Sequence, residues 1–349
     1  MQKMSHDAYK AAGVDIDGAM ETKRNIRDMV RSTFRPEVLT DIGSFGGLFK
    51  PDFSEIDSPV LVSSADGVGT KLKVACMTGR HDTVGADLVN HCCNDILVMG
   101  ARPLFFLDYL AYSRHIDALV TEVISGITCA CRENNCALVG GEMAELPDVY
   151  HPGEYDLAGM IVGVAGEKDI LDGSRVCEGD VILGLASTGL HTNGYTLARK
   201  LIFQTAGLAP DDMLPETGKT VADTLLAVHR SYGPSLLPLL KNDIIHAMAH
   251  ITGGGFTGNI NRTLPAHLDA FIDLESWTVP PLFRFLEKVG SLTEKELYRT
   301  FNMGIGMTVT LHPDDVVSVT ESLQTSGEGV FTIGSVVSGS REVHLVHGI

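Results

Sequence analysis

The stretch PVLVSSADGVGTK, residues 59–71, joins an apolar run to a carboxylate, two glycines, a hydroxyl and a lysine. The apolar run predicts a β-strand, and the glycines after it predict a tight turn whose backbone can approach a ligand closely. Amides at Gly67 and Gly69 would reach phosphate oxygens, while Lys71 supplies a positive charge. Asp66 would hold a divalent cation. The alternative is an ordinary β-turn with a solvated aspartate and lysine.

Strands and helices alternate around this stretch, so we expect the α/β (α+β) fold class. Helical patterns cover 81–100 and 115–133, and another helix is expected over 19–34 with Asp17 as its N-cap. The alternation is not strict enough for a doubly wound parallel sheet. The other strand-like runs are PLFFLDYLA (103–111), CALVG (136–140), LAGMIVGVAG (157–166) and VILGLA (181–186).

A loop rich in turn-forming residues, LDGSRVCEGD (171–180), separates two series of strands and helices. The length of 349 residues suits two domains of ordinary size. We therefore expect an N-terminal domain over 1–170 and a C-terminal domain over 171–349.

The net charge is −17, from 27 Lys and Arg against 44 Asp and Glu, and it repels a phosphate backbone. Non-specific nucleic-acid binding is therefore not expected. The apolar runs fall short of the ~20 residues that span a bilayer, and the N-terminus lacks the apolar core of a signal peptide. The seven cysteines form no CxxC pair, which favours reduced thiols in a cytoplasmic protein.

A second candidate site residue is Asp95, a carboxylate on a helix face that should be apolar. At 100° per residue, it falls within the stripe formed by Val84, Leu88, Cys92 and Met99. A buried carboxylate is costly unless it is paired, hydrogen-bonded or bound to a metal. A structural hydrogen bond or ion pair is the alternative.

A third acid, Glu142, directly follows the apolar strand CALVG and the pair Gly140-Gly141. Acids at strand ends, together with one on a helix, are suited to surround a hard cation that bridges phosphates. Jointly, Asp66, Asp95 and Glu142 predict a magnesium–nucleotide site, with Asn94 as a neutral ligand or hydrogen-bonding group.

Two glycine-rich loops in the second half are candidate anion sites. The loop STGLHTNG, residues 187–194, joins a strand to a helix, so its hydroxyls and amides face the positive helix end. The GGG at 253–255 would be another site, and ordinary tight connections are the alternative for both. The GxGxxG pattern at 253–258 does not predict a dinucleotide site, because Pro265 ends the helix after one or two turns.

Seven long blocks of the sequence carry a resemblance to known proteins: YKAAGVDID (9–17), SADGVGTKLKVA (64–75), HDTVGADLVNHCCNDILVMGARPLFFLDYLA (81–111), LVGGEMAELP (138–147), STGLHTNGYTLARK (187–200), AHITGGGFTGNI (249–260) and YRTFNMGIGM (298–307). In these blocks the sequence resembles one family, the phosphoribosylformylglycinamidine cyclo-ligases, also called aminoimidazole ribonucleotide synthetases. A small-molecule kinase of the same superfamily is the alternative.

The resemblance implies two α/β domains, with the N-terminal strands of two subunits forming a shared β-barrel in a homodimer and ATP near that interface. It also implies that ATP and Mg²⁺ are the cofactors. From the residues themselves, 9–17 is expected to close as a lid when ATP binds, because AAG gives it flexibility while Lys10 and Asp15 give it charged groups to order against ligands. The implied metal ligands are Asp66, Asp95 and Glu142. The nucleotide-binding residues expected are Lys10, Asp66, Gly67, Gly69, Thr70, Lys71 and Asn94.

The family's reaction would be ATP-dependent cyclisation of formylglycinamidine ribonucleotide to 5-aminoimidazole ribonucleotide. Lys71, Asp95 and His191 are the candidate catalytic residues. His191 would move a proton, and the alternatives are binding of the substrate phosphate or a structural hydrogen bond. The expected substrate-binding residues are Ser187, Thr188, His191, Asn193, Gly253, Gly254 and Gly255.

Overall fold

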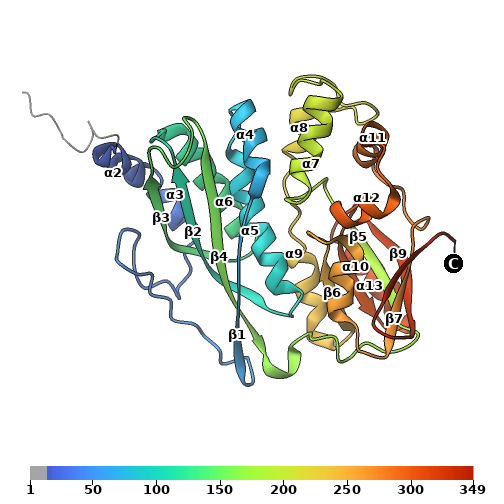
Figure 1. Ribbon diagram of the computed structural model, residues 1–349. Coiled ribbons are helices and arrows are strands. Elements are labelled where there is room, and N and C mark those ends of the chain that lie inside the picture. Colours follow the sequence, from blue (N-terminus) through green and yellow to red (C-terminus); the bar gives the residue numbers. More distant parts are fainter. Residues whose placement is uncertain (1–13, 349) are drawn as a thin grey trace, which may run out of the picture.

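Two β-sheets, with helices between them, make up the chain in the computed structural model, which describes residues 14–348 (Figure 1). Lys10 lies outside these residues, as does most of the predicted lid. The first sheet has the strand order β1-β4-β2-β3. Its strands are β1 (Pro59–Gly67), β2 (Arg102–Tyr112), β3 (Ala137–Glu145) and β4 (Tyr155–Gly166).

Helices cover one face of this sheet. The two long helices, over residues 82–97 and 117–133, pack closely because glycines lie where they cross. A Cβ at Gly85 would lie 2.1 Å from the carbonyl oxygen of Val123. The helices of this half are α2 (Ile16–Asn25), α3 (Arg27–Arg31), α4 (Leu72–Thr78), α5 (Asp82–Leu97) and α6 (Asp117–Glu133).

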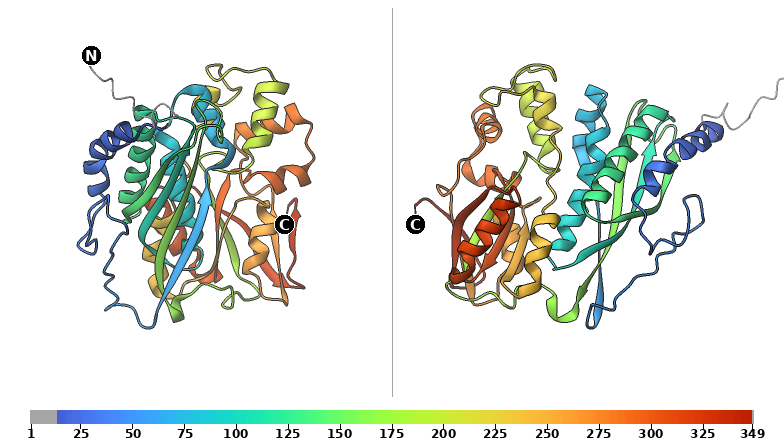
Figure 2. Two further views of the ribbon diagram at one scale, coloured as in Figure 1. Left: turned by 60° about the vertical axis from the view of Figure 1, so that its left-hand side comes forward. Right: turned by 180° about the vertical axis from the view of Figure 1, so that it is seen from behind.

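The other face of the first sheet is open. Large apolar side chains stand on it, since Leu61, Tyr109 and Met160 are 62%, 41% and 38% exposed. The left view of Figure 2 looks toward this sheet, whose strands lie in front of the helices that separate the two halves. Within the described chain, the sheet does not close into a barrel.

The second sheet has the order β10-β7-β9-β5-β8-β6, in which only the β10–β7 pair is parallel. Its strands are β5 (Val181–Ala186), β6 (Ile245–His250), β7 (Leu268–Asp273), β8 (Ile305–Leu311), β9 (Val330–Ser338) and β10 (Val343–Val346). Its helices are α7 (Tyr195–Arg199), α8 (Val221–Leu225), α9 (Gly233–Leu236), α10 (Gly255–Ile260), α11 (Pro281–Gly290), α12 (Glu294–Thr300) and α13 (Val316–Thr325).

The predicted strands are all present, and α5 and α6 confirm the two long helical patterns. The N-terminal helix differs from the prediction, because it divides at Ile26 into α2 and α3. Its N-cap is Asp15, which accepts a hydrogen bond from the amide of Gly18, so the assignment of the cap to Asp17 was wrong. None of the described helices is both long and apolar enough to cross a membrane.

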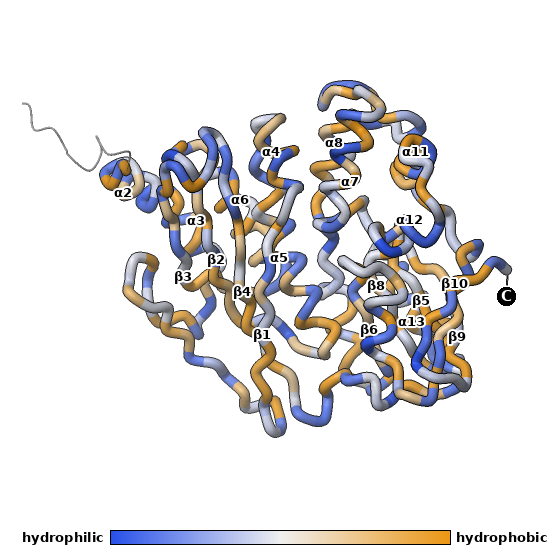
Figure 3. The backbone as a smooth tube through the Cα atoms, viewed as in Figure 1, coloured by the Kyte–Doolittle hydropathy of each residue, from blue (hydrophilic) through white to orange (hydrophobic). Residues whose placement is uncertain are grey.

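Helix α5 places polar side chains in the middle of the molecule. In Figure 3, hydrophobic residues run through the strands of both sheets, while hydrophilic residues also occur on α5 between them. Val84, Leu88 and Cys92 are fully buried as the stripe predicted, whereas Met99 lies beyond the end of the helix and is 38% exposed. The neighbouring polar stripe of α5 faces the second half of the chain, and the candidate site lies there.

Candidate active site

Four histidines from distant parts of the chain converge between the two sheets. They are His91 on α5, His191 in the loop after β5, His229 before α9 and His250 at the end of β6. All four are buried, with exposed fractions between 0% and 6%. The rings of His191 and His229 stack with centroids 4.0 Å apart, and His91 and His250 lie 5.1 Å apart.

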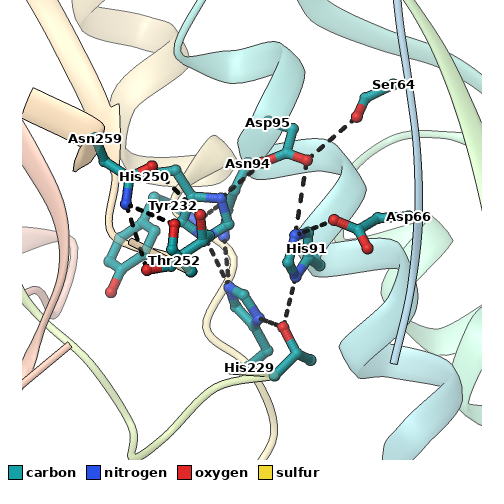
Figure 4. Close-up of polar contacts among 12 residues, drawn as sticks. Ser64, Asp66, His91, Asn94, Asp95, His229, Tyr232, His250, Thr252 and Asn259 are labelled. Atoms are coloured by element: carbon teal, nitrogen blue, oxygen red, sulfur yellow. Dashed lines mark hydrogen bonds and ion pairs between the residues drawn. The ribbon is translucent and has the colours of Figure 1, made fainter. Parts of the chain in front are cut away.

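Two predicted metal carboxylates adjoin this histidine cluster (Figure 4). His91 Nε2 lies 2.8 Å from Asp66 Oδ2 and 3.7 Å from Asp95 Oδ2. His250 Nδ1 lies 2.8 Å from Asp95 Oδ1, and the hydroxyl of Ser64 donates to the other oxygen of Asp95 at 3.2 Å. The structure therefore brings Asp66 and Asp95 together.

A hydroxyl and a third imidazole complete a continuous path of polar contacts. Thr192 Oγ1 lies 2.5 Å from His91 Nδ1 and 3.3 Å from His229 Nδ1. His229 Nε2 lies 3.0 Å from His250 Nε2. Hydrogen-bonding groups thus connect the Asp66 side of the site to the Asp95 side.

Burial and ion pairing set the charges in this cluster. Burial holds the pKa values of His191 and His229 well below the usual value, and that of His250 below it. Burial also lowers the pKa of His91, but its hydrogen bond to Asp66 and the charge of Asp95 outweigh this effect and raise the pKa overall. Most of the cluster is therefore neutral at pH 7, and His91 is the imidazole most easily charged.

The two carboxylates are held in the anionic form. Burial raises the pKa of each, but the hydrogen bonds from His91 to Asp66 and from His250 to Asp95 outweigh it and lower the pKa. Their side chains remain 44% and 26% exposed. Partly exposed anionic oxygens are the donors that Mg²⁺ prefers.

A tri-histidine metal site does not fit the same cluster. The nitrogen atoms of His191, His229 and His250 lie close enough to be considered, within 4.8 Å of one another. However, the stacked rings of His191 and His229 are only 21° from parallel, so their in-plane lone pairs do not converge on one ion. The carboxylate oxygens are the better cation donors.

Glu142, the third predicted metal ligand, does not join this site. The sheet register places Glu142 beside Tyr109, then Ala158, then Gly67, so three strand spacings, about 14 Å, separate it from the turn after Asp66. Glu142 shares the open face of the sheet with Tyr109, whereas Asp66 faces α5. Within one chain the structure therefore does not bring Glu142 to the other two acids, because neighbouring residues of a strand point to opposite faces.

The turn after Asp66 has the expected shape. Asp66 Oδ1 accepts the amide of Gly67 at 2.6 Å, and Gly69 has a φ of +65° with open space where a side chain would stand. The hydroxyl of Thr70 lies 2.9 Å from that of Thr196 on α7. Lys71 differs from the expectation, because it is fully buried and points away from this turn.

The side chain of Asn94 is also fully used in contacts within the protein. It is fully buried, its Nδ2 donates to the carbonyl of Arg230 at 2.8 Å, and its Oδ1 accepts the amide of Tyr232 at 3.0 Å. Asn94 therefore anchors the segment that carries His229, and the expectation that it contacts a nucleotide has no support in this arrangement.

The two predicted anion loops adjoin each other. A Cβ at Gly253 would lie 3.4 Å from Asn193 Oδ1, and the buried Nδ2 of Asn193 has no hydrogen-bond partner. The Ser187 hydroxyl donates to Asn302 Oδ1 at 3.1 Å, and that of Thr188 donates to the carbonyl of Val228 at 2.5 Å. Asn193 thus has a donor free for a ligand, while both hydroxyls are already in use.

Glycines shape the rest of these loops. Gly254 and Gly255 have φ values of +97° and +65°, and a Cβ at Gly255 would lie 1.7 Å from the carbonyl oxygen of Tyr298. Only glycine allows this close approach. Gly255 therefore maintains the fold, and Gly253 and Gly254 are the loop positions open to a ligand.

His191 has a positive φ of +60°, a rare conformation for a residue with a side chain. The amide of Thr188 donates to its Nε2 at 3.2 Å, and its buried Nδ1 has no partner. A Cβ at Gly306 would lie 2.5 Å from the His191 ring and 2.2 Å from the Tyr232 hydroxyl. Gly306, the second glycine in the sequence FNMGIGM, therefore makes room for this histidine.

Four residues of the cluster were not predicted from the sequence: His91, His229, His250 and Thr192. Two signals were available: His91 stands one helical turn before Asp95, and IIHAMAH places two histidines in an otherwise apolar strand. His229 had no such signal, because its neighbours in the sequence contribute no side chain to the cluster.

Family models match both halves of the chain. Residues 52–165 match the model described as "AIR synthase related protein, N-terminal domain", and residues 178–347 match "AIR synthase related protein, C-terminal domain". Two relatives named phosphoribosylformylglycinamidine cyclo-ligase come from Brevibacillus brevis and Geobacter metallireducens. The first is 46% identical over 97% of both chains, and the second is 49% identical over 97% of this chain and 98% of its own.

Solved structures share the fold at low identity. A thiamine-monophosphate kinase from Stenotrophomonas maltophilia has a TM-score of 0.69 at 18% identity, covering 92% of this chain and 95% of its own. Hydrogenase maturation protein HypE in complex with ATP has a TM-score of 0.66 at 17% identity, covering 93% and 90%. PurL of T. maritima complexed with AMPPCP has a TM-score of 0.54 at 14% identity, covering 92% of this chain and 45% of its own.

Proposed function

This chain belongs to the phosphoribosylformylglycinamidine cyclo-ligase family, and we propose that the histidine cluster, with Asp66 and Asp95 beside it, is its active site. The chain is a ligase of purine biosynthesis that closes the ring of formylglycinamidine ribonucleotide with the use of ATP. One observation carries the assignment of the site. Asp95 from the predicted nucleotide half lies 2.8 Å from His250 of the other half, so groups from both halves meet at one place.

The chemistry needs such a meeting place. The formamide oxygen of the substrate is a poor leaving group, so ATP first transfers its γ-phosphoryl group to that oxygen. The amidine nitrogen then attacks the activated carbon and loses a proton, and phosphate leaves with the former formamide oxygen. The products are 5-aminoimidazole ribonucleotide, ADP and phosphate, and catalysis rests on the alignment of the two anionic reactants.

The turn from Asp66 to Thr70 is our proposed phosphate-binding segment for ATP. Its support is the open space at Gly69, together with ATP and AMPPCP in two proteins of the same fold. Asp66 and Asp95 would hold Mg²⁺, because their exposed oxygens are anionic. The ion supplies neutralisation of phosphate charge.

Proton movement is proposed for the imidazoles. His191 stays the candidate acceptor for the proton from the amidine nitrogen, because burial keeps it neutral at pH 7. Its ring stacks on His229, which is hydrogen-bonded to the rest of the cluster. The unpartnered Nδ1 of His191 is the atom that would accept this proton.

The substrate's ribose phosphate is assigned to the loops at 187–194 and 253–255. The unpartnered amide of Asn193 and the open backbone at Gly253 and Gly254 support this assignment. The domain boundary near residue 170 is also part of this proposal. Its support is that one family model ends at residue 165 and the other begins at residue 178.

The open face of the first sheet is proposed to pair with a second copy of the chain, as a barrel shared within a homodimer. Leu61, Tyr109 and Met160 give that face an exposed apolar surface of the kind that association covers. Glu142 stands on the same face and would lie at the interface. A cytoplasmic location belongs to the same proposal and is supported by seven free cysteines.

One incubation tests the proposed reaction. The protein receives ATP, Mg²⁺ and formylglycinamidine ribonucleotide labelled with ¹⁸O in the formyl group, and mass spectrometry follows both products. We expect the substrate to lose one water in mass and the label to appear in inorganic phosphate. A stable phosphorylated product would instead favour the kinase alternative, and unlabelled phosphate would exclude phosphorylation of the formamide oxygen.

A further inference from the structure

Lys71, at the end of the predicted nucleotide turn, points into the protein and forms a buried ion pair. Its Nζ lies 2.7 Å from Asp87 Oδ2 on α5, and neither side chain is exposed. The same ammonium donates to the carbonyl of Ala227 at 2.7 Å and lies 5.6 Å from the centre of the Tyr195 ring. The charged end of the side chain therefore has all of these partners inside the protein.

Asp87 also holds the backbone of one residue of the histidine cluster. Its second oxygen, Oδ1, accepts the backbone amide of His229 at 2.7 Å. One turn further along α5, Asn90 Nδ2 donates to the carbonyl of His229 at 2.8 Å. Both backbone groups of His229 are thus held by α5, and Lys71 holds the carbonyl two residues before it.

We propose that Lys71 is a positioning residue that acts through Asp87 to fix His229, and so links the nucleotide turn to the histidine cluster. This inference rests on the proposed function for the identity of that turn. Lys71 directly follows Thr70, so a shift of the turn on nucleotide binding would pull on Asp87 and on the segment that starts at Ala227. Its role is therefore different from the phosphate contact expected from the sequence.

Burying a charged side chain is costly. An ammonium without water is tolerated only beside a matched anion, and either partner alone would leave an uncompensated charge. Burial lowers the pKa of Lys71 and raises that of Asp87, and the attraction between the two charges opposes both shifts. A phosphate could reach Lys71 only if this pair were broken, and the broken pair would leave Asp87 buried and charged.

Four variants of the full chain separate the two roles. Lys71→Met and Lys71→Arg each disturb the pair. Lys71→Met with Asp87→Asn is neutral and keeps an oxygen that can accept the His229 amide. Lys71→Met with Asp87→Leu is equally neutral but removes that acceptor. For each, Tm, ATP dissociation constant, kcat and the His229 signal in ¹⁵N-histidine NMR are measured.

If Lys71 positions His229, Tm falls in both single variants and recovers in the double variant with Asp87→Asn. It recovers less with Asp87→Leu, because the buried His229 amide is left without an acceptor. The variant with Asp87→Leu should then have a kcat at least about tenfold below that of the variant with Asp87→Asn, because a small misplacement of a catalytic group is costly. Its His229 signal should move, while ATP affinity stays within about threefold of the wild type in both doubles.

Two results would show a phosphate contact and overturn the inference. One is a loss of ATP affinity of about tenfold or more in both double variants. The other is an ATP affinity that is lost in Lys71→Met and retained in Lys71→Arg. Equal kcat and equal His229 signals in the two doubles would also overturn it. A wild type that binds no ATP would count against the proposed function. In that case, the Tm values and the His229 signals still decide whether Lys71 fixes His229.

Discussion

Asp95 and His250 stand 155 positions apart in the chain, and a hydrogen bond of 2.8 Å joins their side chains. One lies on a helix of the first half and the other at the end of a strand of the second half. The ring of His250 is in turn 3.0 Å from that of His229. The carboxylate proposed to serve the nucleotide is therefore positioned by residues of the half proposed to bind the substrate, which suits a reaction between two bound anions.

We expect Asp66→Asn and Asp95→Asn to lower kcat about a hundredfold and to raise the Mg²⁺ concentration needed for half-maximal activity. Both carboxylates contact His91 and are anionic, so each substitution would remove one negative charge from the same cation site. Glu142→Gln is the comparison, because Glu142 lies on the other face of the sheet. Initial rates over a Mg²⁺ titration measure all three.

An unchanged Mg²⁺ requirement in both aspartate variants would contradict the cation site. A shift in Glu142→Gln as large as that in Asp66→Asn would mean that Glu142 reaches the ion from another copy of the chain. Sedimentation of that variant tests this reading, since a residue at the proposed interface should also alter dissociation of the proposed homodimer.

Asn193→Ala should raise the KM for the substrate about tenfold or more and leave the KM for ATP within about twofold. A hydrogen bond to a charged phosphate is commonly worth about 1.5–3 kcal/mol, while the Nδ2 of Asn193 makes no hydrogen bond within the protein that would be lost. The free energy of unfolding should therefore stay the same or rise. Steady-state kinetics and urea unfolding give the two readouts.

Gly253→Ala tests the partner loop, because a Cβ there would stand 3.4 Å from Asn193 Oδ1 in the proposed phosphate site. It should also raise the substrate KM. Gly258→Ala is the matched control, with open space around the added carbon. If the two glycine variants behaved alike, or if ATP affinity fell instead, the phosphate would be assigned to the wrong loops.

Gly306→Ala should lower both Tm and kcat, because the added carbon would press on the His191 ring and on the Tyr232 hydroxyl. Adding Tyr232→Phe removes the closer of these two contacts. The double variant should therefore lose less stability than the sum of the two single losses, a coupling that a double-mutant cycle measures. Additive losses would show that Gly306 does not make room for these side chains.

Local sequence signals predicted the framework well. The strand at 181–186 and the helices α5 and α6 follow directly from apolar runs and periodicity, because each is decided by residues close together in the chain. The same signals found Asp66 and Asp95, since a turn rich in glycine and an acid within an apolar stripe are visible in a short window.

Long-range packing decided the rest. The residues around Lys71 in the sequence predict a phosphate-binding lysine. Its ammonium instead contacts Asp87 and the carbonyl of Ala227 inside the protein. Glu142 was predicted to be a metal ligand at the end of a strand. The alternation of side chains along β3 places it on the open face of the sheet. Neither outcome follows from local pattern, because each depends on which distant element packs alongside.

Stability should depend on pH through Asp108, a carboxyl on β2 that is only 8% exposed. Burial raises its pKa to about 7, with a smaller contribution from Glu142 and a backbone hydrogen bond acting in the opposite direction. Because the pKa in the folded state exceeds that of the unfolded chain, near 3.9, the folded form retains the proton longer. The free energy of unfolding should therefore fall by roughly 4 kcal/mol between about pH 4 and pH 7 and then level off.

Asp108→Asn should remove this contribution, since an amide of similar shape carries no charge at any of these pH values. We expect the variant to be more stable than the wild type above pH 7, and the difference to shrink as the pH falls toward 4. Asp156→Asn, at an exposed position of the neighbouring strand β4, is the control and should keep the slope of the wild type. Urea unfolding at half-unit steps from pH 4.5 to 8 measures the three proteins. Parallel curves for Asp108→Asn and the wild type would mean that Asp108 is ionised in the folded state at neutral pH and has a cationic or hydrogen-bonding partner that offsets its burial.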